Sequence, residues 1–158
     1  MKRIYTLFIA SLLAFSVFGQ TYLSEDFSSG EMPPPGWTIF AFTQQFVNAN
    51  SDLAGGVAPE CRIDGFAYNG TIRMMSPVMN MTGVSSVTLL FKHNFDKNVS
   101  PSPTIGVATK SSGSWTTVWE MQPSSDTGPE DIEVTISNSD LNKPNFQIFT
   151  IAITPYIL

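Results

Sequence analysis

The sequence contains one cysteine and one histidine, Cys61 and His93, and only 13% of its residues are charged. With a single cysteine the chain cannot form an internal disulfide. A structural zinc site needs four nitrogen or sulfur ligands, which these two residues cannot supply. We therefore interpret Cys61 as a small apolar side chain of the interior, and we expect packing to stabilise the fold.

The patterns that mark common enzymes are missing as well. No serine lies in a Gly-x-Ser-x-Gly turn, no Gly-rich phosphate loop occurs, and no spacing of acidic residues predicts an EF-hand. His93 falls among alternating apolar residues, so we interpret it as a hydrogen-bonded core histidine. A serine or Cys61 acting as a nucleophile would have to use this buried ring as its base. We therefore expect no catalysis, and a hydrolase is the remaining enzymatic alternative.

Helical periodicity is also lacking after Gln20. No stretch sustains apolar residues at i, i+3, i+4 and i+7, whereas short runs alternate with a period of two between Gly, Pro, Ser and Asn clusters. The clearest strand is 87–95, with a fully apolar or aromatic face. We predict an all-β protein, an antiparallel β-sandwich of jelly-roll type. Further strands are expected at 37–41, 105–107, 115–119, 132–136 and from 146 onward, with a long loop at 44–59 that includes at most a short irregular strand.

The N-terminal residues indicate export. Two basic residues precede an apolar stretch at 4–18, and the small residues Val17 and Gly19 occupy the −3 and −1 positions before Gln20. This layout predicts a signal peptide at 1–19. The stretch falls short of the about 20 residues that a membrane span needs. An uncleaved membrane anchor is the alternative. We predict a secreted or cell-surface protein that is not inserted in a membrane after cleavage.

Charge narrows the choice of partners. Signal cleavage leaves six basic residues against thirteen acidic ones, so the net charge moves from −5 to about −7. An acidic exported domain repels nucleic acid and anionic lipid, and we expect neither as a partner. Acidic side chains can still attract Ca²⁺, which prefers oxygen ligands. Residues 20–158 have the length of a single domain.

Four stretches of the chain follow one another in an informative order. They are Glu25-Asp26-Phe27 with Gly30 and Met32–Trp37; Met75–Val78 with Met81-Thr82-Gly83; Leu89–Phe95; and Trp115–Trp119. Together they resemble the cleaved-adhesin or choice-of-anchor J domains of Bacteroidetes over residues 22–148. This resemblance implies a jelly-roll sandwich, similar in topology to MAM domains, of the kind carried by secreted and surface proteins.

The chain departs from that family at its C-terminus. Members usually continue from the strand that resembles Phe146 onward to a closing strand with the pattern W-Y-I-D-D-[IV]. Here Tyr156-Ile157 is followed by Leu158, without an aspartate pair. We therefore expect the domain to lack its closing strand, as a truncated or frame-shifted member or as the N-terminal piece of a longer protein. A missing strand leaves its neighbour with unpaired backbone groups.

Glu25 and Asp26 are the candidate metal ligands. They are adjacent on a predicted first strand, so their side chains are expected on opposite faces. One carboxylate there can contribute to a calcium site built largely from backbone carbonyls, since Ca²⁺ takes 6–8 oxygens. The resemblance implies that the closing aspartate pair would contribute too, and this chain lacks it. Calcium is the only cofactor predicted, with solvated surface acids as the alternative.

Trp115, Trp119 and Tyr68 are the candidate ligand-binding residues. Aromatic rings exposed on a sandwich can stack on sugars or anchor a protein partner. Trp115 and Trp119 have the same parity as Thr117, so we expect the three on one strand face, and an inward face would make them core. We predict a non-catalytic adhesion module for a glycan or host protein. The alternatives are a structural accessory domain of a larger secreted protease or adhesin, and a hydrolase.

Overall fold

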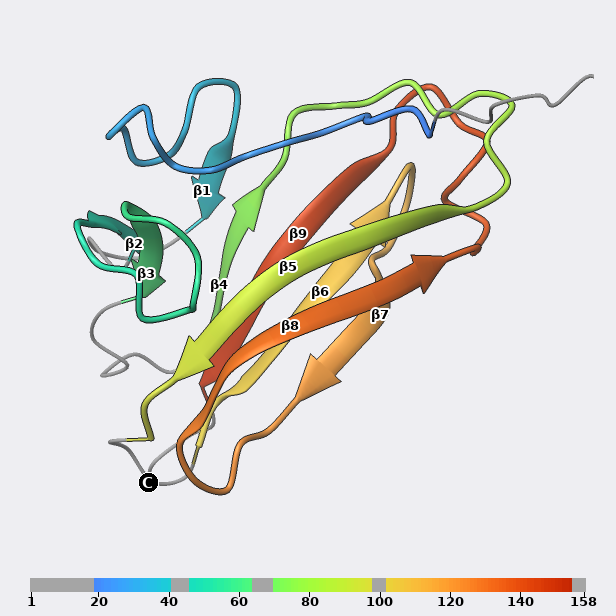
Figure 1. The fold of residues 1–158 in the computed structure, drawn as a ribbon. Helices are drawn as coiled ribbons and strands as arrows, with labels where there is room; N and C mark the ends of the chain where they lie inside the picture. The colour runs from blue at the N-terminus through green and yellow to red at the C-terminus, as the bar shows by residue number, and fades with distance from the viewer. Residues whose placement is uncertain (1–18, 41–45, 64–69, 98–101, 155–158) are drawn as a thin grey trace, which may run out of the picture.

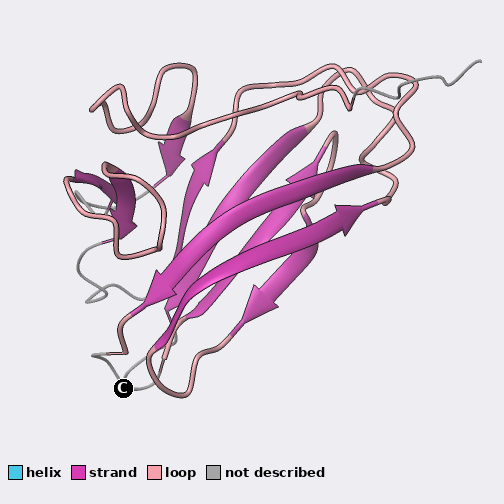
Figure 2. Ribbon diagram, viewed as in Figure 1, coloured by secondary structure: helices cyan, strands magenta, loops and turns pink. Residues whose placement is uncertain are grey.

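The computed structural model describes residues 19–40, 46–63, 70–97 and 102–154. Within these ranges all regular structure is β-strand (Figure 2). All pairings are antiparallel, which confirms the predicted all-β sandwich class. No helix in the described ranges is long and apolar enough to cross a membrane.

Nine strands are formed by the described residues. They are β1 Thr38–Phe40, β2 Phe46–Ala49, β3 Glu60–Ile63, β4 Gly70–Met75, β5 Val87–Phe95, β6 Thr104–Lys110, β7 Thr116–Met121, β8 Thr127–Ile136 and β9 Gln147–Thr154. The largest sheet has the order β1-β4-β9-β6-β7, and β5-β8 and β2-β3 form two-stranded sheets. In the view of Figure 1, β5 and β8 cross in front of the five-stranded sheet, and β2 and β3 lie to their side near β1 and β4.

The seam between β5 and β8 carries the main core. Side chains along β5 alternate between half-buried and exposed, as the sequence predicts. Register places Leu89 opposite Val134 and Phe91 opposite Ile132, so apolar side chains of both strands face the larger sheet. Met81, Ile136 and Phe146 are almost completely buried behind this seam.

A second apolar cluster lies where the β2–β3 hairpin packs on the larger sheet. Phe46 of β2 packs with Ile72 and Met74 of β4, and Cys61 lies beside them. Strands β3 and β4 were not predicted. Both are short and mix polar with apolar residues, so the period of two extends over too few positions to stand out.

Ser76, the residue after β4, hydrogen-bonds to β9. The Ser76 N–H donates to the Ile148 carbonyl (2.9 Å), and the Ser76 hydroxyl accepts from the Ile148 N–H (3.0 Å). Three residues later, Met79 and Phe146 exchange two hydrogen bonds between their backbone N–H and carbonyl groups. The Ser-Pro stretch quoted in the family resemblance therefore has a structural role here.

A buried carboxylate ties the β6–β7 hairpin to the connection between β8 and β9. Asp140 is 5% exposed. Its Oδ2 accepts a hydrogen bond from the Thr109 hydroxyl (2.8 Å), and its Oδ1 accepts from the Ser111 N–H and hydroxyl (both 3.1 Å). Asn138 donates to the Thr109 hydroxyl (2.8 Å) and accepts from the Asp140 N–H (3.0 Å). We call these four residues the Asp140 clamp.

A β-bulge lies near the start of β8. His93 pairs with Glu130 and Phe95 with Thr127, so two residues of β8 oppose Asn94 alone. One of them is Gly128, whose φ of 100° lies in the region that favours glycine. A Cβ at Gly128 would lie 2.6 Å from the His93 carbonyl oxygen. The bulge thus brings the two backbones closer than any side chain would permit.

Candidate functional site

The two tryptophans of the β6–β7 hairpin do not share a face. Val107 pairs with Trp119, but the next residue, Ala108, pairs with Thr117, so Val118 is the extra residue of a β-bulge. Neighbouring residues of β6 point to opposite faces, and Trp119 and Thr117 therefore do as well. The prediction of one shared face was wrong, because counting parity assumes a strand without a bulge.

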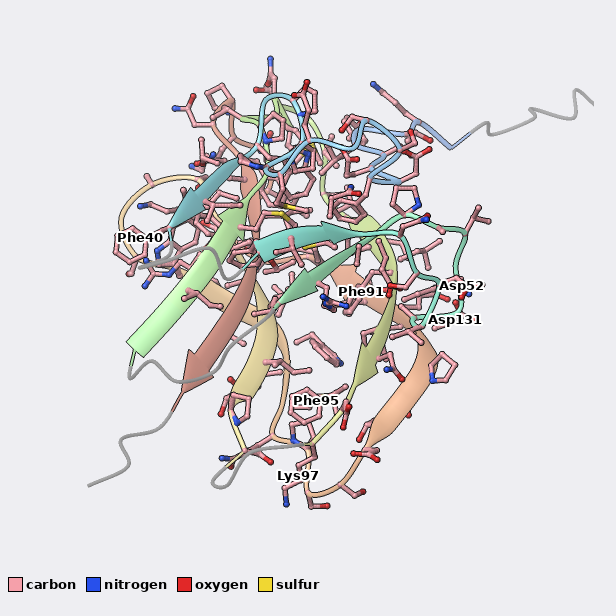
Figure 3. All side chains as sticks on the ribbon, turned by 90° about the vertical axis from the view of Figure 1, so that its left-hand side faces the viewer. Phe40, Asp52, Phe91, Phe95, Lys97 and Asp131 are labelled. Carbon is pink, nitrogen blue, oxygen red and sulfur yellow. The ribbon has the colours of Figure 1, made fainter. Side chains whose placement is uncertain are left out.

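Trp119 lies between the sheets. Its ring centroid is 5.2 Å from that of Phe91, at an interplanar angle of 79°, and 5.5 Å from that of His93. Figure 3 shows Phe91 and Phe95 on the side of β5 that faces the larger sheet. The ring is therefore part of the core, which is the inward alternative that the sequence left open.

His93 is a core residue, but its ring is not hydrogen-bonded. Nδ1 and Nε2 are both buried and have no hydrogen-bond partner. Nε2 lies 3.5 Å from Glu130 Oε2, beyond the usual hydrogen-bond range. The prediction was right about the location and wrong about the hydrogen bond. The rings of Phe91 and Trp119 lie beside the imidazole, and the Glu130 carboxylate stays too far away to accept a normal hydrogen bond.

Cys61 belongs to a different cluster from His93. The thiol packs with the group around Phe46 and Ile72, whereas His93 packs with Phe91 and Trp119. Burial, and after it the negative charge of Glu60, raises the pKa of the Cys61 thiol to about 12. At neutral pH the group is a thiol, which is a poor nucleophile. The arrangement offers no Cys–His pair for covalent chemistry.

Alkylation of Cys61 by iodoacetamide at pH 8 should be about a thousandfold or more slower in the folded protein than in denaturant. The unfolded thiol has a pKa of about 8.5, so a much larger fraction is thiolate once the chain unfolds. Mass spectrometry of the alkylated fraction over time gives both rates, and a Cys61→Ser variant controls for labelling elsewhere. A native rate within tenfold of the unfolded rate would contradict the buried-thiol assignment.

Glu25 and Asp26 lie in turns, and the predicted first strand is not formed. The Phe27 N–H donates to Glu25 Oε1 (2.7 Å), and the Ser28 N–H donates to Asp26 Oδ1 (3.0 Å). Such local bonds favour turns over a strand ladder, and Phe27 has a φ of 60°. Hydrogen bonds from the Ser28 side chain and backbone hold the pKa of Asp26 below its ordinary value.

The Glu25 and Asp26 carboxylates thus form hydrogen bonds with backbone groups close to them in sequence. Each already accepts a hydrogen bond from a residue two positions along the chain. Within the part of the chain that the structure describes, no group of three or more His, Cys, Asp or Glu side chains could hold a metal ion. A calcium ion here would need further oxygens from backbone carbonyls.

Trp115 faces away from β5 and β8. Its ring lies against the Phe149 ring, and Lys110 Nζ lies 4.6 Å from its centroid. Phe149 neighbours Ile148, which packs in the core, so Phe149 points to the other side of the sheet. Trp115 is half-buried and covers Phe149, which has no exposed surface. The pair forms a supported aromatic group.

A second aromatic side chain lies on the same side of the sheet. Arg73 Cζ is 5.5 Å from the Phe40 ring centroid, and Arg73 follows Ile72 and precedes Met74, both of which point into the core. Arg73 and Phe40 are cross-strand partners. We call this side the outer face, defined by Phe40, Arg73, Lys110, Trp115, Glu120 and Phe149.

Comparisons with protein-family models, with curated proteins and with solved structures find no match. Tyr68, the third predicted ligand-binding residue, lies outside the described residues. Sequence reasoning singled out Trp115 and missed Arg73, Lys110, Glu120 and Phe149 of the outer face. Lys110 could have been found, because a hairpin loop at 111–114 makes it the neighbour of Trp115. Phe149 and Arg73 could not, since their placement depends on strand pairings distant in sequence.

Proposed function

We propose that this chain is an exported, non-catalytic binding module that recognises an extracellular glycan or protein through the outer face. The observation that carries the proposal is the half-buried Trp115 on the outer face, whose ring lies beside Phe149 and the Lys110 ammonium and keeps part of its surface exposed. A ring fixed in advance loses little conformational freedom on binding. Amphipathic rings of this kind dominate recognition at many interfaces.

The absence of catalysis belongs to the same proposal. The ring nitrogens of His93 are buried, and the Cys61 thiol packs elsewhere with a raised pKa. Neither can serve a substrate without rearrangement of the core. Membership of the choice-of-anchor J family, jelly-roll connectivity and secretion are also proposed, on the motif order and the signal-peptide layout of the sequence.

Replacing Trp115 should abolish most binding. On a glycan array and in titrations with the ligand it identifies, Trp115→Ala should bind about tenfold or more weakly than the wild type. Because Trp115 also covers Phe149, each titration needs a thermal melt beside it, and Trp115→Phe keeps a ring in place. Leu90→Ala is the matched control, since Leu90 is a 69% exposed apolar side chain on β5. Equal affinity of Trp115→Ala and wild type would refute the proposed site.

Calcium binding at Glu25 and Asp26 stays a prediction. If a site forms, Ca²⁺ at about 100 times its dissociation constant should add roughly 2.7 kcal/mol to the free energy of unfolding. Thermal melts with Ca²⁺ and then with a chelator measure the change. A Glu25→Gln, Asp26→Asn double variant should lose the shift. Identical melts in Ca²⁺ and chelator would exclude a stabilising calcium site.

A further inference from the structure

The five-stranded sheet has an unusual charge distribution for this protein. The chain as a whole has a formal net charge of −5. Yet the five strands of this sheet contain only three charged residues, which are Arg73, Lys110 and Glu120. The sheet is therefore slightly positive within an acidic protein.

All three charges lie on the outer face. Arg73 pairs with Phe40 on one side. On the other side, the register leads from Arg73 across β9 to Gly106 of β6 and then to Glu120 of β7. Residues paired in this way lie on the same face of the sheet. Lys110 pairs with Gln147, which shares its face with Phe149. Both cations thus stand on the side that carries Trp115, with a single carboxylate beside them.

Three exposed acidic side chains lie close together in sequence on another part of the molecule. Strand β8 alone contains Glu130, Asp131 and Glu133, and they are exposed. Figure 3 shows Asp131 with Asp52 on one side of the molecule and Phe40 on the opposite side. An anionic ligand is therefore repelled from the β8 side and attracted to the outer face.

Each cation of the outer face is held over an aromatic ring, at 5.5 Å for Arg73 and Phe40 and 4.6 Å for Lys110 and Trp115. Such contacts are weak wherever solvent reaches the cation, and both cations are only half-buried. A carboxylate can therefore engage the cation at little loss, and Arg73 offers a fork that fits a carboxylate in two-point contact.

The spacing of the two pairs indicates an extended ligand. Arg73 and Lys110 are two strands apart and four residues apart along the strand direction. With about 4.8 Å between strands and about 3.3 Å per residue, their Cα atoms are about 16 Å apart. A single sugar cannot reach both pairs, whereas a chain of several sugars with repeated carboxylates can.

From these observations, and on the basis of the proposed function, we infer that the ligand is an acidic polysaccharide whose carboxylates pair with Arg73 and Lys110 while a sugar ring contacts Trp115. A neutral glycan would satisfy the aromatic rings and leave the cations without a partner on the ligand. Carboxylates of an acidic protein could also pair with the two cations, and the experiment distinguishes this case.

The test compares polygalacturonate, alginate and hyaluronan with their carboxyl-esterified forms, which keep the backbone and remove the charge. The full-length protein should bind at least one acidic form, at least tenfold more tightly than its ester, and less tightly as salt rises. Arg73→Gln and Lys110→Gln should each weaken binding about tenfold. Lys92→Gln is the matched control, since Lys92 is paired with Asp131 on the other layer, and it should leave binding unchanged.

Several outcomes would overturn the inference. The first is equal binding of the acid and its ester. The second is an equal loss of binding in Lys92→Gln and Lys110→Gln. The third is no binding of any acidic form while Trp115 still supports binding of a neutral glycan or an acidic protein. The proposed function would survive those results. It fails separately if Trp115→Ala leaves every measured interaction unchanged.

Discussion

Replacing Asp140 by alanine should lower the free energy of unfolding by about 3–4 kcal/mol. The carboxylate accepts three hydrogen bonds from Thr109 and Ser111, and hydrogen bonds to a charged group contribute about 1.5–3 kcal/mol each before the losses overlap. Removal also leaves the Thr109 hydroxyl, which is fully buried, without this acceptor. Urea denaturation followed by tryptophan fluorescence measures the change.

Asp126 provides the control for this prediction. Its carboxylate also accepts a backbone hydrogen bond, from the Lys97 N–H at 2.8 Å, but it is exposed. Asp126→Ala should therefore change stability by about 1 kcal/mol or less. The stability loss in Asp140→Asn should lie between those of Asp140→Ala and Asp126→Ala, because asparagine keeps the shape of the side chain and loses its charge. If Asp140→Ala and Asp126→Ala were equally mild, the Asp140 clamp would not be a main determinant of stability.

Gly128→Ala should destabilise the protein by about 3 kcal/mol, through two effects that add. A φ of 100° strains any side-chain-bearing residue, at about 1–2 kcal/mol. The new Cβ would also lie 2.6 Å from the His93 carbonyl oxygen and 2.9 Å from Asn94 Cα, both backbone atoms. Forcing them apart costs about another 1–3 kcal/mol, as other overpacked sites do.

Gly83 separates the two effects. Its φ is 85°, similarly unfavourable for alanine, but a Cβ there would meet nothing within 4 Å. Gly83→Ala should therefore show the conformational strain alone, about 1–2 kcal/mol. The difference between the two variants in chemical denaturation measures the contact at the bulge. Equal losses would mean that the β5–β8 backbones can move apart freely.

The sequence predicted those elements whose evidence is local. Strand β5 shows its alternation over nine residues, and β8 shows it from Ile132 to Ile136, so both were found. The turn at Glu25 and Asp26 was mistaken for a strand because two polar side chains before an aromatic residue do not reveal that they bond their own backbone. The β-bulge beside Trp119 leaves no mark in a single strand, since it is defined by the register with β6.

The candidate site was predictable only in part for the same reason. Trp115 stands out by residue type, and Lys110 follows from the hairpin. Phe149 and Arg73 join them only because β9 pairs with both β4 and β6, which no local pattern in the sequence indicates. The Asp140 clamp likewise joins residues 29 and 31 positions apart.

The central position of β9 has a consequence for how the protein reaches its native state. Partners in this part of the sheet, such as Met74 and Thr150, are 76 positions apart. β4 and β6 do not pair with each other. Each pairs instead with β9, which follows both of them in the chain, so the backbone groups on their facing edges are hydrogen-bonded only when β9 is in place. The conformational entropy of closing such long loops is lost before the stabilising contacts form, and domains of this kind fold in about milliseconds to seconds. The five-stranded sheet is therefore complete only when β9 has paired with both β4 and β6.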